Sequence, residues 1–405
     1  MINEQIGRLK NLKHFLEAIL ALIIYRYPGR QLKVIGVTGT DGKTTTVHLI
    51  YHLLNTADKK VAFISTVGAK IGKKEIDTGF HVTTPNPWHV QKILRQLVNQ
   101  KIEYVVLEST SHGLDQHRLL GCNFSIGVLT NITHEHLDYH RTFKRYLKAK
   151  AKLFKNVKIA ILNRDDKHFN YLKRVAKKAQ VISYGIKKKA DFTPQNFKFK
   201  TSLVGEYNQY NCLAAIAITS SLGIEKKVIK KAIQSFKPVK GRMEEIKEGQ
   251  KFRVIVDFAH TPNSLKQTLK TLRSQIPSKS RLITVFGCAG ERDREKRPMM
   301  GKIATELADL TVLTTEDPRT EDVDEIINQI AKGCQKGGGV EDKTFFRVPD
   351  RQEAINFAIQ KLAKKNDIVV ICGKGHEKSI CFGKKELPWS DQKAAKKALG
   401  VRLRS

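Results

Sequence analysis

The chain has 405 residues, enough for two or three domains at roughly 150 residues each. Its 40% hydrophobic and 28% charged residues are typical of a globular protein and exclude a collagen, a coiled coil or a wholly disordered chain. The net charge of +34 comes from 73 Lys and Arg against 39 Asp and Glu, and the lysines are spread along the chain, which favours a solvated basic surface.

Residues 1–31 are predicted to form an N-terminal helical extension that ends at the breaker pair Pro28-Gly29. Its apolar run, Phe15 to Tyr25, is too short to span a bilayer and is not followed by a signal-peptide cleavage site. We expect this helix to cover the core of the next domain, with contact to a membrane surface as the alternative. Six cysteines without a C-x-x-C pair indicate reduced thiols in a cytoplasmic protein.

Short apolar runs alternate with helical stretches through the rest of the chain. LKVIGV, KVAFIST, EYVVLEST, SIGVLTN and KIAILN are predicted strands, and a second series, FRVIVDFAH, RLITVFG, DLTVLTT and DIVVICG, follows the Pro- and Gly-containing linker FKPVKGR. Such alternation predicts an α/β fold with mostly parallel sheets. We therefore expect a central P-loop ATPase domain over residues 32–238 and a Rossmann-like α/β domain over residues 239–405.

A glycine-rich turn, GVTGTDGKTTT, lies between the first strand and the helix that follows it. Backbone N–H groups of such a turn can bind phosphate oxygens at a helix N-terminus. Lys43 is expected to reach the β- and γ-phosphates of ATP, and the Thr44 hydroxyl to ligate Mg²⁺. The strict Walker spacing is not met, because Val37 stands five residues before Gly42. The residues assigned to nucleotide binding here are Gly39, Thr40, Asp41, Gly42, Lys43, Thr44 and Thr45.

Two further strand ends carry candidate metal ligands. Glu108 ends a buried strand, where ligand sites of α/β sheets form. The segment THEHLDYH suggests zinc, but it has no thiol and no H-E-x-x-H spacing, so a histidine that ligates Mg²⁺ is the better interpretation. Surface histidines are the alternative.

These segments, taken in order, resemble the Mur ligases of bacterial peptidoglycan synthesis, and most closely the MurE type that adds a diamino acid. The resemblance rests on GVTGTDGKTTT, TTPN, ESTSHGLDQHR, TNITHEHLDYH, YLKAKAKLF, GEYNQYN, GRMEE, VDFAHTPNSL, VFGCAGERDREKRP, TEDPRTE and CGKGHE. It implies an ATP-dependent ligase that forms an amide bond. A carboxylate of UDP-MurNAc-L-Ala-D-Glu would attack ATP to give an acyl phosphate, which the amine of the diamino acid would then attack.

The same resemblance assigns roles to residues in the first domain. It implies that Lys43, His136 and Lys150 are catalytic and that Thr44, Glu108, His136 and Lys150, the last as a carbamate, are ligands of Mg²⁺. Asn208 and Asn211 would lie near adenine, and Asp257 and His260 of the second domain would close over the nucleotide. The muramyl-peptide would contact Thr83, Thr84, Thr110, Gln116 and Arg118.

The diamino-acid pocket is expected in the second domain, at Arg292, Glu316, Asp317, Pro318, Arg319, Gly373 and Glu377. Two arginines can bind a distal carboxylate in bidentate fashion, which favours meso-diaminopimelate. Asp317 stands where members that add diaminopimelate commonly have Asn, so L-lysine remains the alternative.

Family members also carry an N-terminal domain that holds uridine diphosphate, whereas only about thirty residues precede the phosphate loop here. Uridine recognition is therefore expected to be lost, weakened or taken over by another surface. We expect a monomer. Three other functions stay open: a two-domain ligase like folylpolyglutamate synthase, a basic P-loop protein that binds nucleic acid, and a non-catalytic partner protein. A basic P-loop protein that binds nucleic acid would need aromatic residues along a basic surface. Aromatic residues make up only 7% of the chain and lie mostly in apolar runs, so no nucleic acid is expected as a partner.

Overall fold

The computed structural model describes residues 2–71, 74–76 and 84–403, and the chain divides into two units. The first unit comprises Met1–Thr133 and His140–Lys237, and the second comprises His134–Tyr139 and Pro238–Ser405. One boundary between the two units along the chain therefore falls within helix α5 (Leu137–His140). The division at residue 237 falls in the FKPVKGR segment, the predicted linker. The short segment 134–139 groups with the second unit, whereas the prediction for the central domain, residues 32–238, includes it.

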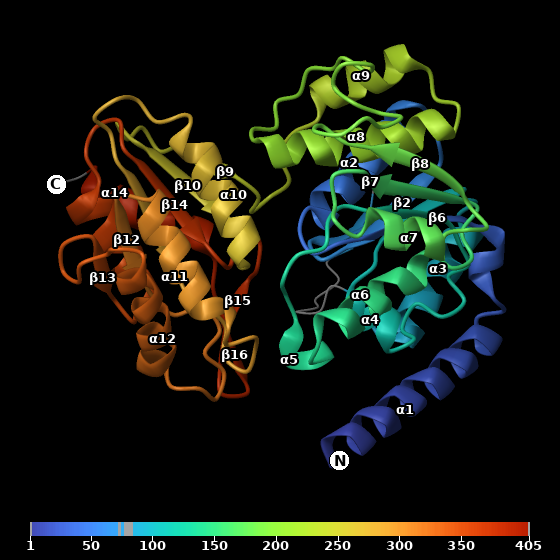
Figure 1. The fold of residues 1–405 in the computed structure, drawn as a ribbon, viewed down its shortest axis with the longest axis horizontal. Coiled ribbons are helices and arrows are strands. Elements are labelled where there is room, and N and C mark those ends of the chain that lie inside the picture. The colour runs from blue at the N-terminus through green and yellow to red at the C-terminus, as the bar shows by residue number, and fades with distance from the viewer. Residues whose placement is uncertain (1, 72–73, 77–83, 404–405) are drawn as a thin grey trace. The chain divides into compact units, whose positions relative to one another are not determined.

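The first unit is built on an eight-stranded sheet with the order β4-β3-β2-β5-β1-β6-β7-β8 (Figure 1). Its central strands are parallel, whereas β2, β3 and β4 are joined as antiparallel neighbours. The strands are β1 (Lys33–Thr38), β2 (Val61–Ser65), β3 (Gly68–Ile71), β4 (Lys74–Ile76), β5 (Tyr104–Glu108), β6 (Phe124–Leu129), β7 (Ile159–Asn163) and β8 (Gln180–Tyr184).

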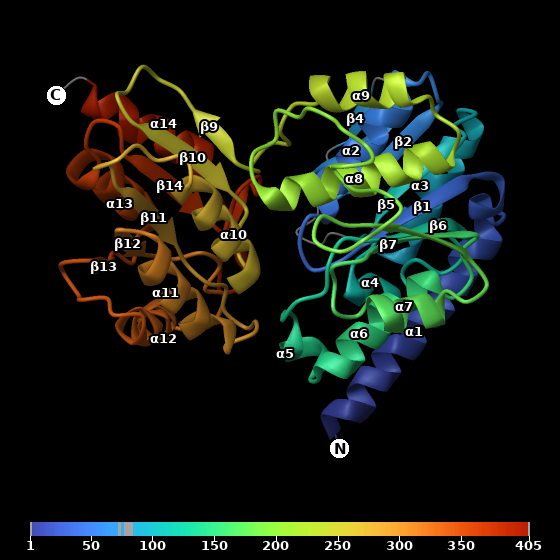
Figure 2. The ribbon, with the colours of Figure 1, turned by 45° about the horizontal axis from the view of Figure 1, so that its top comes forward.

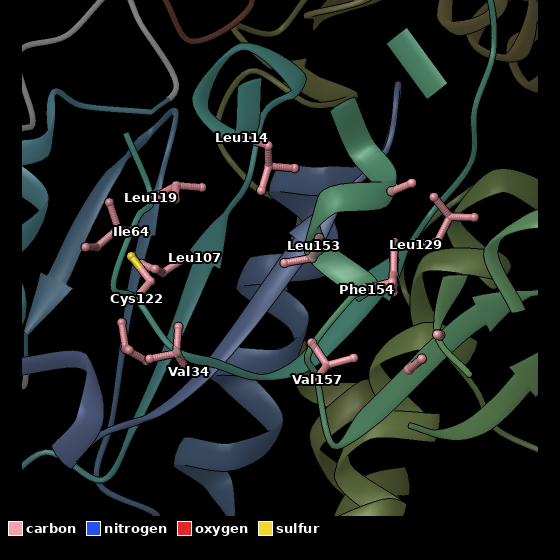
Figure 3. Close-up of a cluster of buried hydrophobic side chains, with 14 of the residues drawn as sticks. Val34, Ile64, Leu107, Leu114, Leu119, Cys122, Leu129, Leu153, Phe154 and Val157 are labelled. Atoms are coloured by element: carbon pink, nitrogen blue, oxygen red, sulfur yellow. The ribbon is translucent and has the colours of Figure 1, made fainter. Parts of the chain in front are cut away.

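Helices cover both faces of this sheet because its parallel strands are apolar on both sides. Figure 1 shows α2 (Lys43–Thr56), α8 (Glu206–Ser221) and α9 (Lys226–Ser235) on one face, and α4 (Ser111–Asp115), α6 (Phe143–Ala151) and α7 (Phe169–Val175) on the other. Figure 3 shows the core of the second face, where strand residues Val34, Leu107 and Leu129 lie with Leu153 and Phe154 of the turn η2 (Lys152–Phe154).

The N-terminal helix α1 (Ile2–Ile24) packs on α3 (Pro87–Asn99). Its Leu22 lies so close to the turn at Gly121 that a Cβ there would be 2.0 Å from a Leu22 methyl group. Arg95 of α3 donates to the carbonyl of Tyr25 over 2.9 and 2.7 Å, which satisfies an otherwise orphaned group just beyond the helix end. The opposite face of α1 carries exposed apolar side chains, namely Leu12, Leu16, Leu20, Ile23 and Ile24.

The second unit contains a six-stranded sheet with the order β13-β12-β11-β14-β10-β9, in which only β9 runs antiparallel to its neighbour. The strands are β9 (Glu244–Ile246), β10 (Arg253–Asp257), β11 (Leu282–Phe286), β12 (Leu310–Leu313), β13 (Phe345–Arg347) and β14 (Ile368–Cys372). A separate hairpin is formed by β15 (Ser379–Phe382) and β16 (Lys385–Pro388).

Alternate residues of these strands enter two different cores, as the period of two in a strand requires. Ile255 and Val370 lie with α10 (Pro262–Arg273), α11 (Lys296–Leu307) and α12 (Val323–Lys336), whereas Val254 and Val369 lie with α13 (Arg351–Asn356), the π-helical turn η3 (Phe357–Leu362) and α14 (Asp391–Arg402) (Figure 2). Helices on both faces of two mostly parallel sheets confirm the predicted α/β class.

Side chains cap the N-termini of several helices. Asn86, Asp322, Asp350 and Ser390 each accept a hydrogen bond from the third backbone N–H that follows, and Thr261 and Ser264 form a capping box at α10. All nine predicted strands are present, and seven further strands were not predicted, namely β3, β4, β8, β9, β13, β15 and β16. These are mostly short edge or hairpin strands, whose apolar pattern is weak. No helix of the described residues is both long enough and apolar enough to cross a bilayer.

Candidate active site

The candidate phosphate-binding loop, called the phosphate-type loop below, lies between β1 and α2. Its conformation depends on two glycines. Gly42 has a φ of 81°, and a Cβ there would lie 2.4 Å from Asn211 Oδ1. A Cβ on Gly39 would lie 1.8 Å from Thr130 Oγ1. No other residue fits at either position without moving these neighbours.

The segment after β6 holds this loop in place. Asn131 accepts from the Asp41 N–H over 3.0 Å and donates to the Asp41 carbonyl over 3.0 Å, while Thr130 donates to the same carbonyl over 2.7 Å. Gly39 to Gly42 are thus fixed at the start of a 14-residue helix, whose N-terminus favours an anion.

The predicted metal ligands of the first unit lie together at the carboxyl end of the sheet. The Thr44 hydroxyl donates to both oxygens of Glu108, over 3.1 and 3.0 Å, and both residues are 4% exposed. The Thr66 N–H fixes one of these oxygens over 3.0 Å. Hydroxyl and carboxylate oxygens at this spacing fit Mg²⁺, which takes oxygen ligands in octahedral geometry. Lys43 Nζ donates to the Thr40 carbonyl over 2.7 Å, so its amine stays beside the loop.

Lys150 extends from α6 to the same loop. It is 1% exposed, its Nζ donates to the Gly39 carbonyl over 2.6 Å, and it lies 4.7 Å from the centre of the Tyr146 ring. The Tyr146 hydroxyl is in turn bonded to Thr40 over 2.8 Å. The sequence alone gives Lys150 no distinction from other helical lysines, and its burial follows from tertiary packing.

His136 belongs to the segment that groups with the second unit, where its Nδ1 lies 3.9 Å from Glu135 Oε1. Thr44, Glu108 and Lys150 belong to the first unit. The four residues assigned to the metal are therefore divided between the two units.

The residues assigned to the muramyl-peptide lie around the start of α4. The Thr84 and Thr110 hydroxyls are 2.8 Å apart, and Arg118 donates to the Thr84 carbonyl over 3.0 Å. Thr110 also caps α4, and Gln116 follows the last residue of that helix. Thr83 lies outside the described residues.

Asn208 and Asn211 are buried on α8 rather than presented on a helix surface. Asn211 donates to Asn208 over 3.0 Å and accepts from Thr46 over 3.2 Å, which links α8 to the helix after the phosphate-type loop. Adenine binding by either residue stays a prediction.

Asp257 and His260 follow β10 in the second unit. Asp257 accepts from the Met243 and Ala259 N–H groups over 2.7 and 3.0 Å, so it organises the turn before α10, and burial raises its pKa. His260 Nδ1 lies 2.9 Å from the Phe258 carbonyl. Their contact with a nucleotide stays a prediction.

Most residues of the predicted amino-acid pocket gather where β12 and β14 end. Asp317 is paired with Lys374, a residue that the sequence analysis did not single out, over 2.7 Å, and Lys374 also pairs with Glu377 over 2.5 Å. Burial alone would lower the pKa of Lys374, but the carboxylates of Glu377 and Asp317 raise it, so this side chain is a buried cation. The sequence signal that could have identified Lys374 is its position in GKGHE, a segment that shares the predicted pocket with the acidic residues of TEDP.

Arg292 and Arg319 belong to the same unit, and their charges interact. Arg292 is exposed, and partial desolvation together with the charge of Arg319 lowers the pKa of its guanidinium group. Arg319 has a φ of 52° and donates to the Gly290 carbonyl over 2.6 Å, which fixes its direction. The two positive charges repel each other, so a carboxylate ligand that contacts both guanidinium groups would be stabilised. Pro318, which precedes Arg319 in the chain, is buried.

Glu316 is buried, its charged neighbours include Asp317 and Lys374, and burial raises its pKa to about 7. A Cβ on Gly373, whose φ is 110°, would lie 3.0 Å from Glu316 Oε2, so glycine leaves room for this carboxyl group. Glu316 Oε2 has no hydrogen-bond partner among the described residues.

This raised pKa predicts a pH-dependent stability. Since a Glu carboxyl ordinarily titrates at 4.5 and Glu316 at about 7, the folded protein binds more protons between these values, and its free energy of unfolding falls as the pH rises through them. The loss is on the order of 3 kcal/mol. Glu316→Gln should remove this loss of stability. The melting temperature of the variant minus that of the native protein should therefore rise between about pH 5 and pH 8. An unchanged difference would contradict the raised pKa.

Comparison with known families matches both units. Residues 37–219 match the Mur ligase middle domain, and residues 241–375 match the family described as Mur ligase, glutamate ligase domain. A UDP-N-acetylmuramoyl-L-alanyl-D-glutamate–2,6-diaminopimelate ligase of Geobacillus thermodenitrificans is 40% identical over 95% of this chain and 82% of its own length. The ligase of the same name from Nostoc sp. is 41% identical over 95% of this chain and 80% of its own length.

Two solved structures are also similar to this chain. A UDP-N-acetylmuramoyl-L-alanyl-D-glutamate–2,6-diaminopimelate ligase has a TM-score of 0.61 at 32% identity, and the match covers 92% of this chain and 79% of that one. Folylpolyglutamate synthase of Mycobacterium tuberculosis has a TM-score of 0.70 over 91% of this chain and 96% of its own, but only 15% identity, so it shares the fold alone.

Proposed function

Because this chain belongs to the Mur ligase family, we propose that it joins 2,6-diaminopimelate to UDP-N-acetylmuramoyl-L-alanyl-D-glutamate at the expense of ATP, in peptidoglycan precursor synthesis. The observation that carries the proposal is the identity of about 40% to several ligases of that name, together with two arginines whose charges interact and the phosphate-type loop. The cytoplasm, where ATP is made, is the expected compartment.

The reaction has two steps. An oxygen of the substrate's glutamate carboxylate forms a bond to the γ-phosphorus of ATP as the bond to ADP breaks, which gives an acyl phosphate. The amine of the amino acid then attacks the acyl carbon, phosphate leaves, and the nitrogen loses a proton. Lys43 and the N–H groups of residues 39–42 would bind the phosphates and offset the charge that develops on them.

Thr44 and Glu108 would hold Mg²⁺, with Lys150, as a carbamate, as a further ligand. The family resemblance also assigns a ligand role to His136, which belongs to the second unit. The metal would neutralise phosphate charge when bound. A protonated lysine would repel that cation, whereas carbamylation, in which the neutral amine adds CO₂ and loses a proton, makes the side chain an anion. The burial of Lys150 beside the loop supports this role.

The charges of the second unit favour diaminopimelate over lysine. Lysine and diaminopimelate both carry an ammonium group at the distal end, and only diaminopimelate carries a second carboxylate there. Asp317 is neutralised by the fully buried Lys374, so it does not repel that carboxylate. The Asp at this position therefore does not create a site for a cation. Arg292 and Arg319 instead suit the second carboxylate of diaminopimelate.

The arginine pocket is tested by Arg319→Ala. Loss of a charge-assisted hydrogen bond should raise KM for diaminopimelate roughly 30- to 100-fold and leave KM for ATP nearly unchanged. Arg347→Ala is the control, because that arginine only pairs with Glu341 and Asn328 at the surface. An equal rise of both KM values would place the pocket elsewhere.

The proposed reaction is tested with the purified chain, ATP and Mg²⁺. UDP-N-acetylmuramoyl-L-alanyl-D-glutamate, with and without its UDP moiety, is offered meso-diaminopimelate, L-lysine or other amino acids, and phosphate release and product mass are measured. Diaminopimelate should give release and a product of the expected mass. Release that depends on folate and glutamate, or no release with any diamino acid, would overturn the proposal.

A further inference from the structure

Three side chains of the second unit that carry no role in the proposed reaction form a compact group. His134 Nε2 lies 3.1 Å from Asp293 Oδ2 and 3.8 Å from Glu295 Oε2. One ligand atom from each of the three residues lies within 4.8 Å of the other two. Asp293 and Glu295 immediately precede α11, and His134 begins the short segment that groups with this unit.

The two closest atoms of this group are unsatisfied. Asp293 is 4% exposed, and its Oδ2 and the facing His134 Nε2 are both buried without a hydrogen-bond partner among the described residues. The other oxygen, Asp293 Oδ1, accepts from the Glu295 N–H over 3.1 Å, which holds the carboxylate so that Oδ2 faces the imidazole. A buried carboxylate oxygen without a hydrogen-bond partner raises the free energy of the folded protein unless a bound cation compensates its charge.

A second histidine–aspartate pair of the same chain shows the contrast. His168 Nδ1 lies 3.1 Å from Asp166 Oδ1, the same separation. There the carboxylate also accepts from the His168 N–H over 2.8 Å and from the Ile132 N–H over 2.7 Å, so both oxygens are satisfied. No third acid joins that pair among the described residues.

The spacing fits a tetrahedral metal. With bonds of about 2.0–2.1 Å to zinc, neighbouring ligand atoms lie roughly 3.3 Å apart, close to the 3.1 and 3.8 Å observed. The side chain of Glu295 is 71% exposed and can rotate the remaining distance. Imidazole with two carboxylates suits zinc better than magnesium, which prefers oxygen ligands only.

We propose that His134, Asp293 and Glu295 bind one Zn²⁺, with water in the fourth position, as a site distinct from the magnesium ligands Thr44 and Glu108. The sequence segment that first suggested zinc supplies only one of these ligands. The other two ligands lie 159 and 161 positions further along the chain.

The test titrates Zn²⁺ into the EDTA-stripped full chain in excess Mg²⁺, without nucleotide, by calorimetry. Asp293→Asn and Glu295→Ala should each weaken one binding event by about 100-fold or more, since even outer-shell changes cost 10- to 100-fold. His168→Asn, from the satisfied pair, should leave that event unchanged. Co²⁺ in place of Zn²⁺ should give a visible absorption band that both ligand variants lose.

Equal Zn²⁺ affinity in the native chain and in Glu295→Ala would overturn the site, and so would an equal loss in His168→Asn. Glu295 is exposed, so its replacement cannot unfold the chain through a lost core contact. The Glu295→Ala result therefore decides the proposal even if Asp293→Asn fails to fold. Melting temperatures in EDTA check that each variant is folded before metal is added.

Discussion

Lys150→Ala is expected to lose roughly a thousandfold in kcat while the protein keeps its fold. The native side chain is buried beside the phosphate-type loop, where it contacts the Gly39 carbonyl. As a carbamate it would add an anionic ligand next to Thr44 and Glu108, and alanine leaves that position unfilled. Phosphate release at saturating substrates measures the loss.

Chemical rescue separates a carbamate from a merely structural lysine. A short carboxylic acid in the assay should restore part of the activity of Lys150→Ala, because it can occupy the space of the missing carboxylate. Lys148→Ala is the matched control, since Lys148 is exposed on the same helix and should keep full activity. Native activity in Lys150→Ala, or a loss without any rescue, would contradict the carbamate.

The largest effect on stability is expected for Asp391→Ala. Arg351 and Asp391 are 2% and 0% exposed and form a two-point ion pair, with both contacts at 2.8 Å. Arg351 also donates to the carbonyls of Thr315 and Cys372, at the ends of β12 and β14. Removal of the carboxylate leaves a buried guanidinium without its counter-charge, which costs about 3–5 kcal/mol.

Denaturant unfolding, followed for the transition of the second unit, measures this cost, because a chain of two units need not unfold in one step. Glu306→Ala is the control: it breaks the exposed Lys302–Glu306 pair on α11 and should cost less than about 0.5 kcal/mol. The double variant Arg351→Met/Asp391→Leu should recover much of the loss, because apolar side chains need no counter-charge. A loss below about 1 kcal/mol in Asp391→Ala would mean that the pair is not buried in solution.

The α/β class and the phosphate-type loop could be predicted because their signals are local. Buried parallel strands are continuous apolar runs, and the loop between β1 and α2 needs Gly at positions fixed by the backbone. Short edge strands such as β4 and β16 were missed, since three or four largely polar residues carry little pattern.

The residues themselves determined the fold class, the strand that leads into the loop and, through their order, the family. Tertiary structure alone decided which charges meet. It paired Asp317 with Lys374, buried Lys150 beside Gly39, and brought His134 to Asp293 from far along the chain. The physical reason is that periodicity reports which side of a strand or helix is apolar, whereas the free energy of a charge depends on neighbours that only packing brings within a few ångströms.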